Sequence, residues 1–403
     1  MSPIAIILSQ LLSPDASADP EPPAATAAER EEATPALDFS VVYTADTWRN
    51  ARGGLRKGWR YLDNLDVTLA VDGERAFGWE GATLFLYGLY NNGQSLSDEL
   101  VGDVQVVSNI DAGVQAARLY EAWIEQRLMA DRLSLKAGLY DLNSEFDTTE
   151  SGGLFLNSSH GIGPDFSQTG ENGPSIFPVT SLAFRVEYSF SENLLLRAAV
   201  LDGVPGDPER PRRTAVKLSS DEGALLVAEI NYLDERTKVA AGSWRYTARF
   251  ENLLATARAG EPIERRGNGG VYMLAERKLV REKSDDAQGL SGWVRFGFAD
   301  ERFNAIGRYA GGGLVYTGAF AGRNEDQLGL AFSRIRFGSR YRLAAALTGE
   351  TVSEGETNIE LTYRTAVAPW LTVQPDLQYV IDPGGVRGRR DALVAGIRTE
   401  IGF

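Results

Sequence analysis

The segment from residue 121 to residue 127 carries side chains that suit the binding of a sugar. Every second position holds one of them: Glu121, Trp123, Glu125 and Arg127. In a β-strand, residues two apart lie on one face, so these four would form a single row. An indole offers a plane for the C–H face of a pyranose ring, and charged groups form strong hydrogen bonds with its hydroxyls. The row therefore predicts a surface that binds a polar ring, provided that this face meets water.

Neighbouring segments continue the pattern and add polar residues on the same predicted face: Arg132, Lys136 and Tyr140, then Arg185 and Glu187. Later segments place further polar residues there: Asn358, Glu360, Arg364, Gln374, Asp376, Gln378, Arg398 and Glu400. The alternative for any one of these charged residues is that it only keeps the water-filled lumen wall hydrated and forms an ion pair with a residue on the neighbouring strand. For Trp123 the alternative is packing beneath a folded loop.

The elements that must position these residues read as strands of a membrane barrel. Apolar and polar residues alternate in many segments of 8 to 14 residues, for example at 64–72, 132–139, 181–190, 224–232, 290–298, 371–381 and 391–403. About 9–11 residues cross a bilayer at a tilt, and in such a barrel the apolar face meets lipid while the polar face lines the lumen. We expect an all-β fold, a transmembrane antiparallel β-barrel of about sixteen strands counted from residue 60. The alternation is interrupted at residues 334–336, within 303–342.

Bulk composition limits the other possibilities. The net charge is −14, with one His and no Cys among 403 residues. An acidic chain disfavours a nucleic-acid backbone as partner, and a single His160 makes a zinc centre or a Ser-His-Asp triad hard to build. No metal or cofactor is expected. Glu121 and Glu125 would lie ~13 Å apart along a strand, too far for a glycosidase pair, and we expect no enzyme.

Residues 141–180 do not read as a strand. They are rich in Gly, Ser, Asn and Pro, and loops of this length are usually functional. We expect this loop to fold into the lumen and narrow it. Asn157 and His160 lie within it and are further candidates for contact with solute, although a structural role inside the loop is favoured for His160.

The first residues differ from the rest of the chain. Residues 1–18 contain a short apolar stretch that ends in Ala16-Ser17-Ala18, which has the form of a signal-peptide cleavage site. Residues 19–44 are rich in Pro, Ala and Glu, and we expect them to be disordered. The barrel domain is expected over 45–403.

Three strings carry a family resemblance: residues 138–146, GLYDLNSEF; residues 156–166, LNSSHGIGPDF; and residues 173–181, GPSIFPVTS. They closely resemble the OprB family of carbohydrate-selective porins, as do residues 61–66 and 119–125. The resemblance is strong over most of 45–235, and the C-terminal half shares the strand pattern and the terminal Phe403.

The resemblance implies a sixteen-stranded channel in the Gram-negative outer membrane through which sugars diffuse passively. Two alternatives stay open: a porin of this architecture for other small polar or ionic solutes, and a barrel serving as an envelope enzyme or structural anchor. The expected partners are sugars, outer-membrane lipid, the barrel-assembly machinery through Phe403, and further copies of the chain in a homotrimer.

Overall fold

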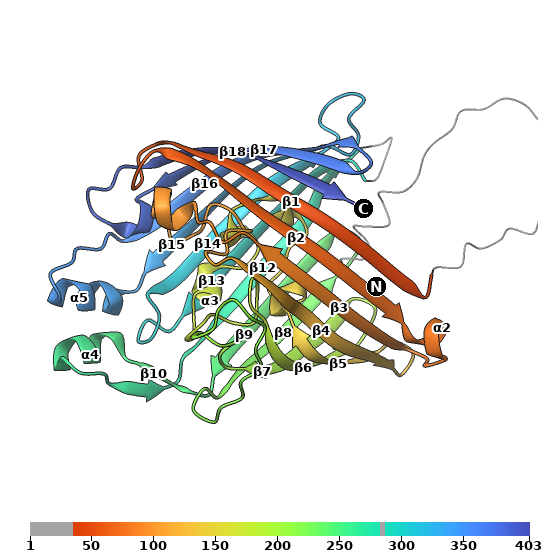
Figure 1. The fold of residues 1–403 in the computed structure, drawn as a ribbon, viewed down its shortest axis with the longest axis horizontal. Helices are drawn as coiled ribbons and strands as arrows, with labels where there is room; N and C mark the ends of the chain where they lie inside the picture. Colours follow the sequence, from red (N-terminus) through yellow and green to blue (C-terminus); the bar gives the residue numbers. More distant parts are fainter. Residues whose placement is uncertain (1–34, 283–286) are drawn as a thin grey trace, which may run out of the picture.

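A computed structural model describes residues 35–282 and 287–403, and these form a closed antiparallel barrel of sixteen strands (Figure 1). The barrel strands are β1 (Leu37–Arg52), β2 (Gly58–Asp72), β3 (Ala82–Asn91), β4 (Ala116–Leu128), β5 (Leu133–Tyr140), β6 (Ser181–Ser189), β7 (Leu194–Asp202), β8 (Ala224–Leu233), β9 (Thr237–Tyr246), β12 (Gly269–Arg281), β13 (Gly289–Ala299), β14 (Ile306–Thr317), β15 (Gln327–Phe337), β16 (Gly355–Ala368), β17 (Leu371–Ile381) and β18 (Ala392–Gly402). β1 pairs with both β2 and β18, so the sheet has no free edge.

Alternation of side chains fixes which face of each strand meets lipid. In β8, Leu226, Ile230 and Tyr232 are exposed on the outer wall. Glu229 and Asn231 lie between them and are buried inside the barrel. A one-residue slip would place these two polar groups in hydrocarbon, so the sequence holds the register.

Short turns and long loops lie at opposite ends of the barrel. The turns 129–132, 190–193 and 234–236 lie at the end at which β1 begins and β18 ends, where α2 (Gly73–Phe77) also lies. The other end carries α4 (Leu253–Ala259), the small β10–β11 sheet (Arg249–Glu251, Glu264–Arg266) and α5 (Ser339–Leu347) (Figure 1). Short turns face the periplasm in bacterial barrels, and the long-loop end is called extracellular below.

The expected all-β barrel and its sixteen strands are confirmed, with one difference in where the strands begin. β1 begins at Leu37, before residue 60 and before the boundary expected at residue 45, so residues 37–44 belong to the barrel. Their alternation is easily missed because the Pro/Ala/Glu-rich stretch runs directly into it. The predicted signal peptide and most of the predicted disordered segment lie outside the described residues.

The break in alternation expected at residues 334–336 is absent from the backbone. β15 keeps its parity through this stretch: Ile335 is buried inside, while Arg334 and Arg336 are exposed outside. The chemical pattern is inverted because arginines occupy outward positions here, close to the extracellular end of the strand.

The wall parity can be tested with a pair of arginine substitutions. Leu86 lies in the middle of β3 on the outer face, and Thr68 lies beside it on β2 on the inner face. Leu86→Arg should lower the free energy of unfolding by about 2–4 kcal/mol because the charge enters hydrocarbon. Thr68→Arg should cost less because its side chain reaches water. Urea titration of the barrel in lipid vesicles measures both, and equal losses would contradict this orientation.

Candidate functional site

Two loops fold into the lumen from the extracellular end. The expected one, residues 141–180, contains η2 (Leu142–Ser144), η3 (Ser151–Leu154), η4 (Ser158–His160) and α3 (Pro164–Ser167). The second, residues 92–115 with η1 (Ser97–Val101), was not predicted from the sequence. The loops bond to each other, since Asn109 N donates to Leu156 O at 2.7 Å and Ser158 N to Val106 O at 3.0 Å. Together they form a plug that covers part of the wall from inside.

Carboxylates of the wall hold the backbone of both loops. Glu360 on β16 accepts hydrogen bonds from Leu156 N at 2.5 Å and Asn157 N at 3.1 Å. Glu276 on β12 accepts from the N–H groups of residues 150 and 151, and Glu229 on β8 from that of residue 147. Glu356 accepts from residues 104 and 105 of the other loop. Each of these side chains accepts one or two backbone N–H groups of the loops and so fixes one stretch of loop.

An apolar contact supports this anchoring on the β8–β13 side. The ring of Phe166 in α3 stacks on Trp244 of β9, with centroids 5.0 Å apart and planes 3° apart. Arg295 of β13 reaches the same part of the loop and forms ion pairs with Asp147, at 2.7 Å, and with Asp165. All five side chains are buried, so this side of the lumen is packed like a protein core.

The start of the long loop is tied to β5–β7 through Glu145. Four wall groups contact its carboxylate: Lys136 Nζ at 2.6 Å, Tyr140 Oη at 2.6 Å, Arg185 Nε at 2.8 Å and Arg197 Nε at 3.7 Å. Burial alone would raise the pKa of Glu145, but the three cations outweigh burial and hold it well below its usual range. Glu145 therefore stays ionised. It and Arg197 were missed in the sequence because their role depends on how the loop returns to the wall.

The row expected on β4 lies inside the barrel as predicted, but part of it serves the loop. Glu121 is buried and accepts from Asp141 N at 2.9 Å. Glu125 is buried too, accepts from Ser134 Oγ at 2.6 Å and lies 3.3 Å from Arg185. These two carboxylates are structural partners of β5, β6 and the loop rather than free ligands.

Trp123 is enclosed on both faces. The ring of Phe85 on β3 stacks against it with centroids 5.0 Å apart, and Lys136 Nζ on β5 lies 4.1 Å from its centroid. Because β3 and β5 flank β4, these contacts fall on opposite faces of the indole. Its Nε1–H donates to Glu121 at 3.3 Å. A pyranose cannot lie on either face in this arrangement, and the geometry favours the packing role.

Four other charged residues reach water inside the periplasmic half of the barrel. Arg127 on β4 and Glu187 on β6 have side chains that are 35% and 24% exposed. Arg364 on β16 and Glu400 on β18 form a partly exposed pair at 3.1 Å. Glu187 is paired with Arg197. These residues lie on the periplasmic side of the plug. Arg127, Glu187, Arg364 and Glu400 are therefore the charged residues, among those predicted to face the lumen, that a solute can reach.

The remaining predicted residues lie elsewhere. Asn157 donates to Gln378 on β17 at 3.2 Å, far around the wall from β4. His160 is buried between Phe155 and Trp293, and burial lowers its pKa to about 3. Its 3.4 Å contact with Glu360 therefore involves a neutral imidazole, which agrees with the structural role favoured above.

Arg132 does not join the predicted group. It lies in the turn before β5, and its guanidinium donates to Tyr188 Oη at 3.1 Å and lies over that ring. Tyr188 belongs to the outward-facing set of β6, because Arg185 and Glu187 point inward. The alternation that predicted an inward Arg132 does not extend into the turn.

A bulge on β4 turns Tyr120 inward, although strict alternation with the inward row Glu121, Trp123, Glu125 and Arg127 would point it toward lipid. The pairing with β3 shifts between Tyr87 and Gly88, which leaves Tyr120 as the extra residue. Tyr120 is consequently buried, and its hydroxyl donates to Asp141 at 2.7 Å instead of facing lipid. The tyrosine thereby helps to hold the start of the long loop.

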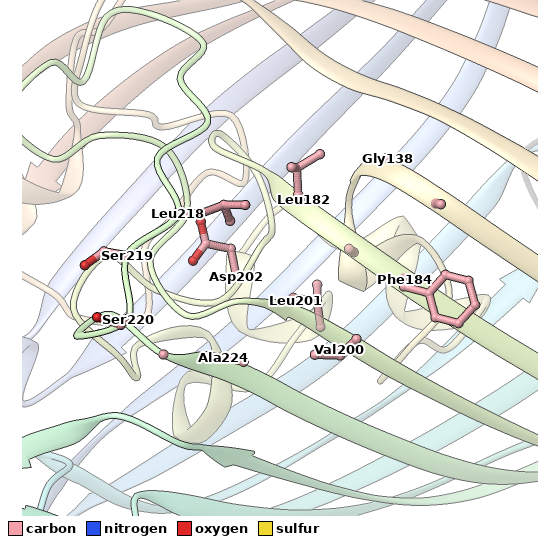
Figure 2. Close-up of a pocket in the computed structure, with 13 residues that line it drawn as sticks. Gly138, Leu182, Phe184, Val200, Leu201, Asp202, Leu218, Ser219, Ser220 and Ala224 are labelled. Carbon is pink, nitrogen blue, oxygen red and sulfur yellow. The ribbon is translucent and has the colours of Figure 1, made fainter.

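A pocket of about 550 Å³ lies outside this lumen (Figure 2). Its floor includes Phe184 and Val200, which point outward from β6 and β7, and its rim includes Leu218, Ser219 and Ser220 of the β7–β8 loop. Because these floor side chains are on the lipid-facing wall, the pocket is not part of a solute path through the barrel.

A closed sixteen-stranded barrel that is narrowed by inward loops and lined by charged pairs has the architecture of a porin. The model of the family described as "Carbohydrate-selective porin, OprB family" matches residues 56–403. Porin B of Pseudomonas aeruginosa is 27% identical over 405 residues, covering 91% of this chain and 87% of that protein. A putative porin, QuiX of Acinetobacter baylyi, is 21% identical and covers 90% and 89%.

A solved structure shares the fold. The high-pH structure of Pseudomonas putida OprB has a TM-score of 0.82 at 24% identity, covering 91% of this chain and 94% of that one. The chain belongs to the OprB family of carbohydrate-selective porins. It is a sugar-selective channel of the Gram-negative outer membrane, and the family points to a channel rather than an enzyme.

The anchoring of the long loop by wall carboxylates generates a testable prediction. Glu360→Ala leaves Leu156 N and Asn157 N without acceptors, at a cost of about 1–3 kcal/mol for each buried donor. The closed position of the loop should lose population, and single-channel conductance in planar bilayers should rise and become noisier.

Glu400→Ala is the matched control, because Glu400 is also an inward wall carboxylate but pairs with Arg364 and not with a loop. It should leave the noise unchanged. Identical traces for Glu360→Ala and the wild-type protein would mean that Glu360 does not hold the loop.

Proposed function

We propose that sugars pass beside the plug and that their hydroxyls bind the partly exposed charged residues of the periplasmic half, Arg127 on β4 and Glu187 on β6 among them. The observation that carries this proposal is the contrast in burial between the wall that the loops contact and the periplasmic ends of β4 and β6. The β8–β13 side is packed against the long loop, whereas Arg127 and Glu187 keep side chains open to water. A solute that crosses the barrel meets these groups.

The chemistry of these pairs suits a polyol. A guanidinium supplies several donors in one plane and a carboxylate supplies acceptors, so an Arg–Glu pair can bond both lone pairs and protons of adjacent hydroxyls. Arg127 lies 3.7 Å from Glu125, and Arg197 forms an ion pair with Glu187. Because each cation has a carboxylate partner, the pairs carry little net charge and favour a neutral polar solute over an ion.

Liposome swelling tests the substrate class. Vesicles that contain the protein should swell faster in sugars than in amino acids or small anions of equal size. Equal rates for all three would favour the alternative of a porin for small polar or ionic solutes in general.

Substitutions on β4 separate binding from packing. Arg127→Gln should weaken sugar block of the ion current about fivefold, which corresponds to roughly 1 kcal/mol for one hydrogen-bonding group, with the heat stability unchanged. Trp123→Ala should instead lower the temperature of heat unfolding, because both faces of its ring are packed. Current recording with added sugar and gel mobility after heating measure the two effects.

Arg245→Gln is the control for loss of charge, since Arg245 points outward near the extracellular end of β9. If sugar blocks the ion current through the Arg127→Gln protein as strongly as through the wild-type protein, sugars bind to another part of the wall.

Two finer properties are also proposals. The first is that the barrel-assembly machinery recognises Phe403, whose side chain is exposed and whose backbone pairs with Val41 at the periplasmic rim. Deletion of Phe403 should lower the yield of folded protein in the outer membrane, and that yield is the measurement. The second is that the protein forms a homotrimer, and light scattering of the purified protein measures the mass of the assembly.

A further inference from the structure

The outer wall carries three arginines close together on β14 and β15: Arg308, Arg334 and Arg336. All three are exposed and have outward parity, because Tyr309 and Ile335 between them are buried inside the barrel. They lie near the extracellular ends of their strands. A cation costs ~2–4 kcal/mol at the membrane midplane but only about 0–1 kcal/mol near the interface, so these positions are at the level of lipid headgroups.

Two of these cations face each other directly. Arg308 pairs with Arg336 across the β14–β15 ladder, and Arg334 is opposite Ala310. Like charges directly opposite each other destabilise a sheet. Arg336 is 3.3 Å from the exposed Glu354, and Arg334 donates to Thr357 at 2.7 Å. Among the residues that the structure describes, Arg308 has no hydrogen-bond or ion-pair partner. An anion between Arg308 and Arg336 would relieve this repulsion.

A largely apolar groove lies on the same strands, on the periplasmic side of these arginines. It has a volume of about 690 Å³, and its lining runs from Thr237 on β9 to Ile359 on β16 and includes Arg277 on β12. Outward side chains form its walls: Leu279, Leu314, Leu330 and Phe332. Gly292 keeps the floor low, since a Cβ there would lie 3.0 Å from Leu314 Cδ2 and 3.1 Å from Leu279 Cδ1. The groove is therefore shaped by missing side chains in a wall that otherwise bears large apolar ones.

The order of charge and groove matches a lipid of the outer leaflet. Gly312 in the groove is four residues from Arg308 toward the periplasm, and Leu330 is four residues from Arg334 in the same direction. Four residues of strand span ~13 Å. A lipid whose headgroup is at the extracellular interface directs its acyl chains toward the membrane centre, which is the direction from the arginines to the groove.

We propose that this face of β12–β16 binds a phosphorylated lipid of the outer leaflet, with a headgroup phosphate between Arg308 and Arg336 and one acyl chain in the groove. Arginine suits this role because its planar fork bonds two phosphate oxygens at once. The site is on the outer wall and is independent of sugar passage through the lumen. It gives the inverted pattern at residues 334–336 a physical reason.

Binding of a defined lipid tests the proposal. The purified full-length protein in detergent is mixed with bisphosphorylated lipid A, with the same lipid lacking its phosphates, or with inorganic phosphate, and bound molecules are counted by native mass spectrometry. The wild-type protein should bind the bisphosphorylated lipid at least tenfold more tightly than the dephosphorylated one. R308Q/R336Q should lose this preference.

Control variants separate the contributions. R245Q removes an outward arginine that faces Leu226 and Gly269 rather than a second arginine, and it should bind as the wild-type protein does. A275L fills the groove between β12 and β13 and should weaken lipid binding several-fold without touching the arginines. Sugar block should be unchanged in all three variants, which distinguishes this site from the lumen.

Each other result overturns the proposal. Equal lipid binding by R308Q/R336Q and the wild-type protein would mean that the arginines do not hold a headgroup. An equal loss in R245Q would indicate attraction by net charge only. If the wild-type protein binds inorganic phosphate tightly and A275L binds the lipid as well as the wild-type protein does, the arginines bind phosphate alone and the groove does not hold an acyl chain. If the double variant does not fold, R308Q alone is compared in the same way.

Discussion

The lumen of this porin depends on bonds between carboxylates of the wall and backbone N–H groups of the inward loops. A loop that leaves water for the inside of a barrel must find partners for its backbone, and two loops without long helices or strands have few partners of their own. Glu229 on β8, Glu276 on β12, and Glu356 and Glu360 on β16 provide them from three strands. The plug is therefore held by inward acidic residues, of which the sequence pattern had placed Glu360 on the lumen face.

This requirement divides the lumen into a part that the loops cover and a part that stays open to water. Where the loops meet the wall, charged residues are buried with their partners and aromatic rings pack as in a soluble core, as Phe166 does on Trp244. Where the loops do not reach, Arg127 and Glu187 stay open to water. The charged residues that stay open have partners of opposite charge, Glu125 for Arg127 and Arg197 for Glu187.

The outer wall follows a different rule, since its solvent is lipid. Large apolar side chains cover most of it, and charges are tolerated only near the two interfaces. The arginine pair of β14 and β15 belongs to such a region, and the glycine-floored groove below it is the complementary apolar feature. Both faces of these strands thus carry specific information, the inner one for the plug and the outer one for the membrane.

The strand pattern of the sequence was enough to predict the barrel, its sixteen strands and the inward direction of Glu121, Lys136, Arg185 and Glu360. This is possible because alternation is local: a strand between water and lipid must place every second residue outward. The 40-residue gap in the pattern likewise predicted the inward loop. Residues 92–115 were missed because they contain short apolar stretches that no spacing rule assigns to a loop in the lumen.

Only the tertiary structure decided what each inward residue does. Glu121 and Trp123 have the residue types of a sugar site, yet they pack against the loop start and against Phe85 and Lys136. Glu145 and Arg197 became central because a loop returned to strands that are distant in sequence. A strand pattern determines the face on which a side chain lies, but whether that face is open or covered depends on contacts between segments far apart in the chain, which no local periodicity contains.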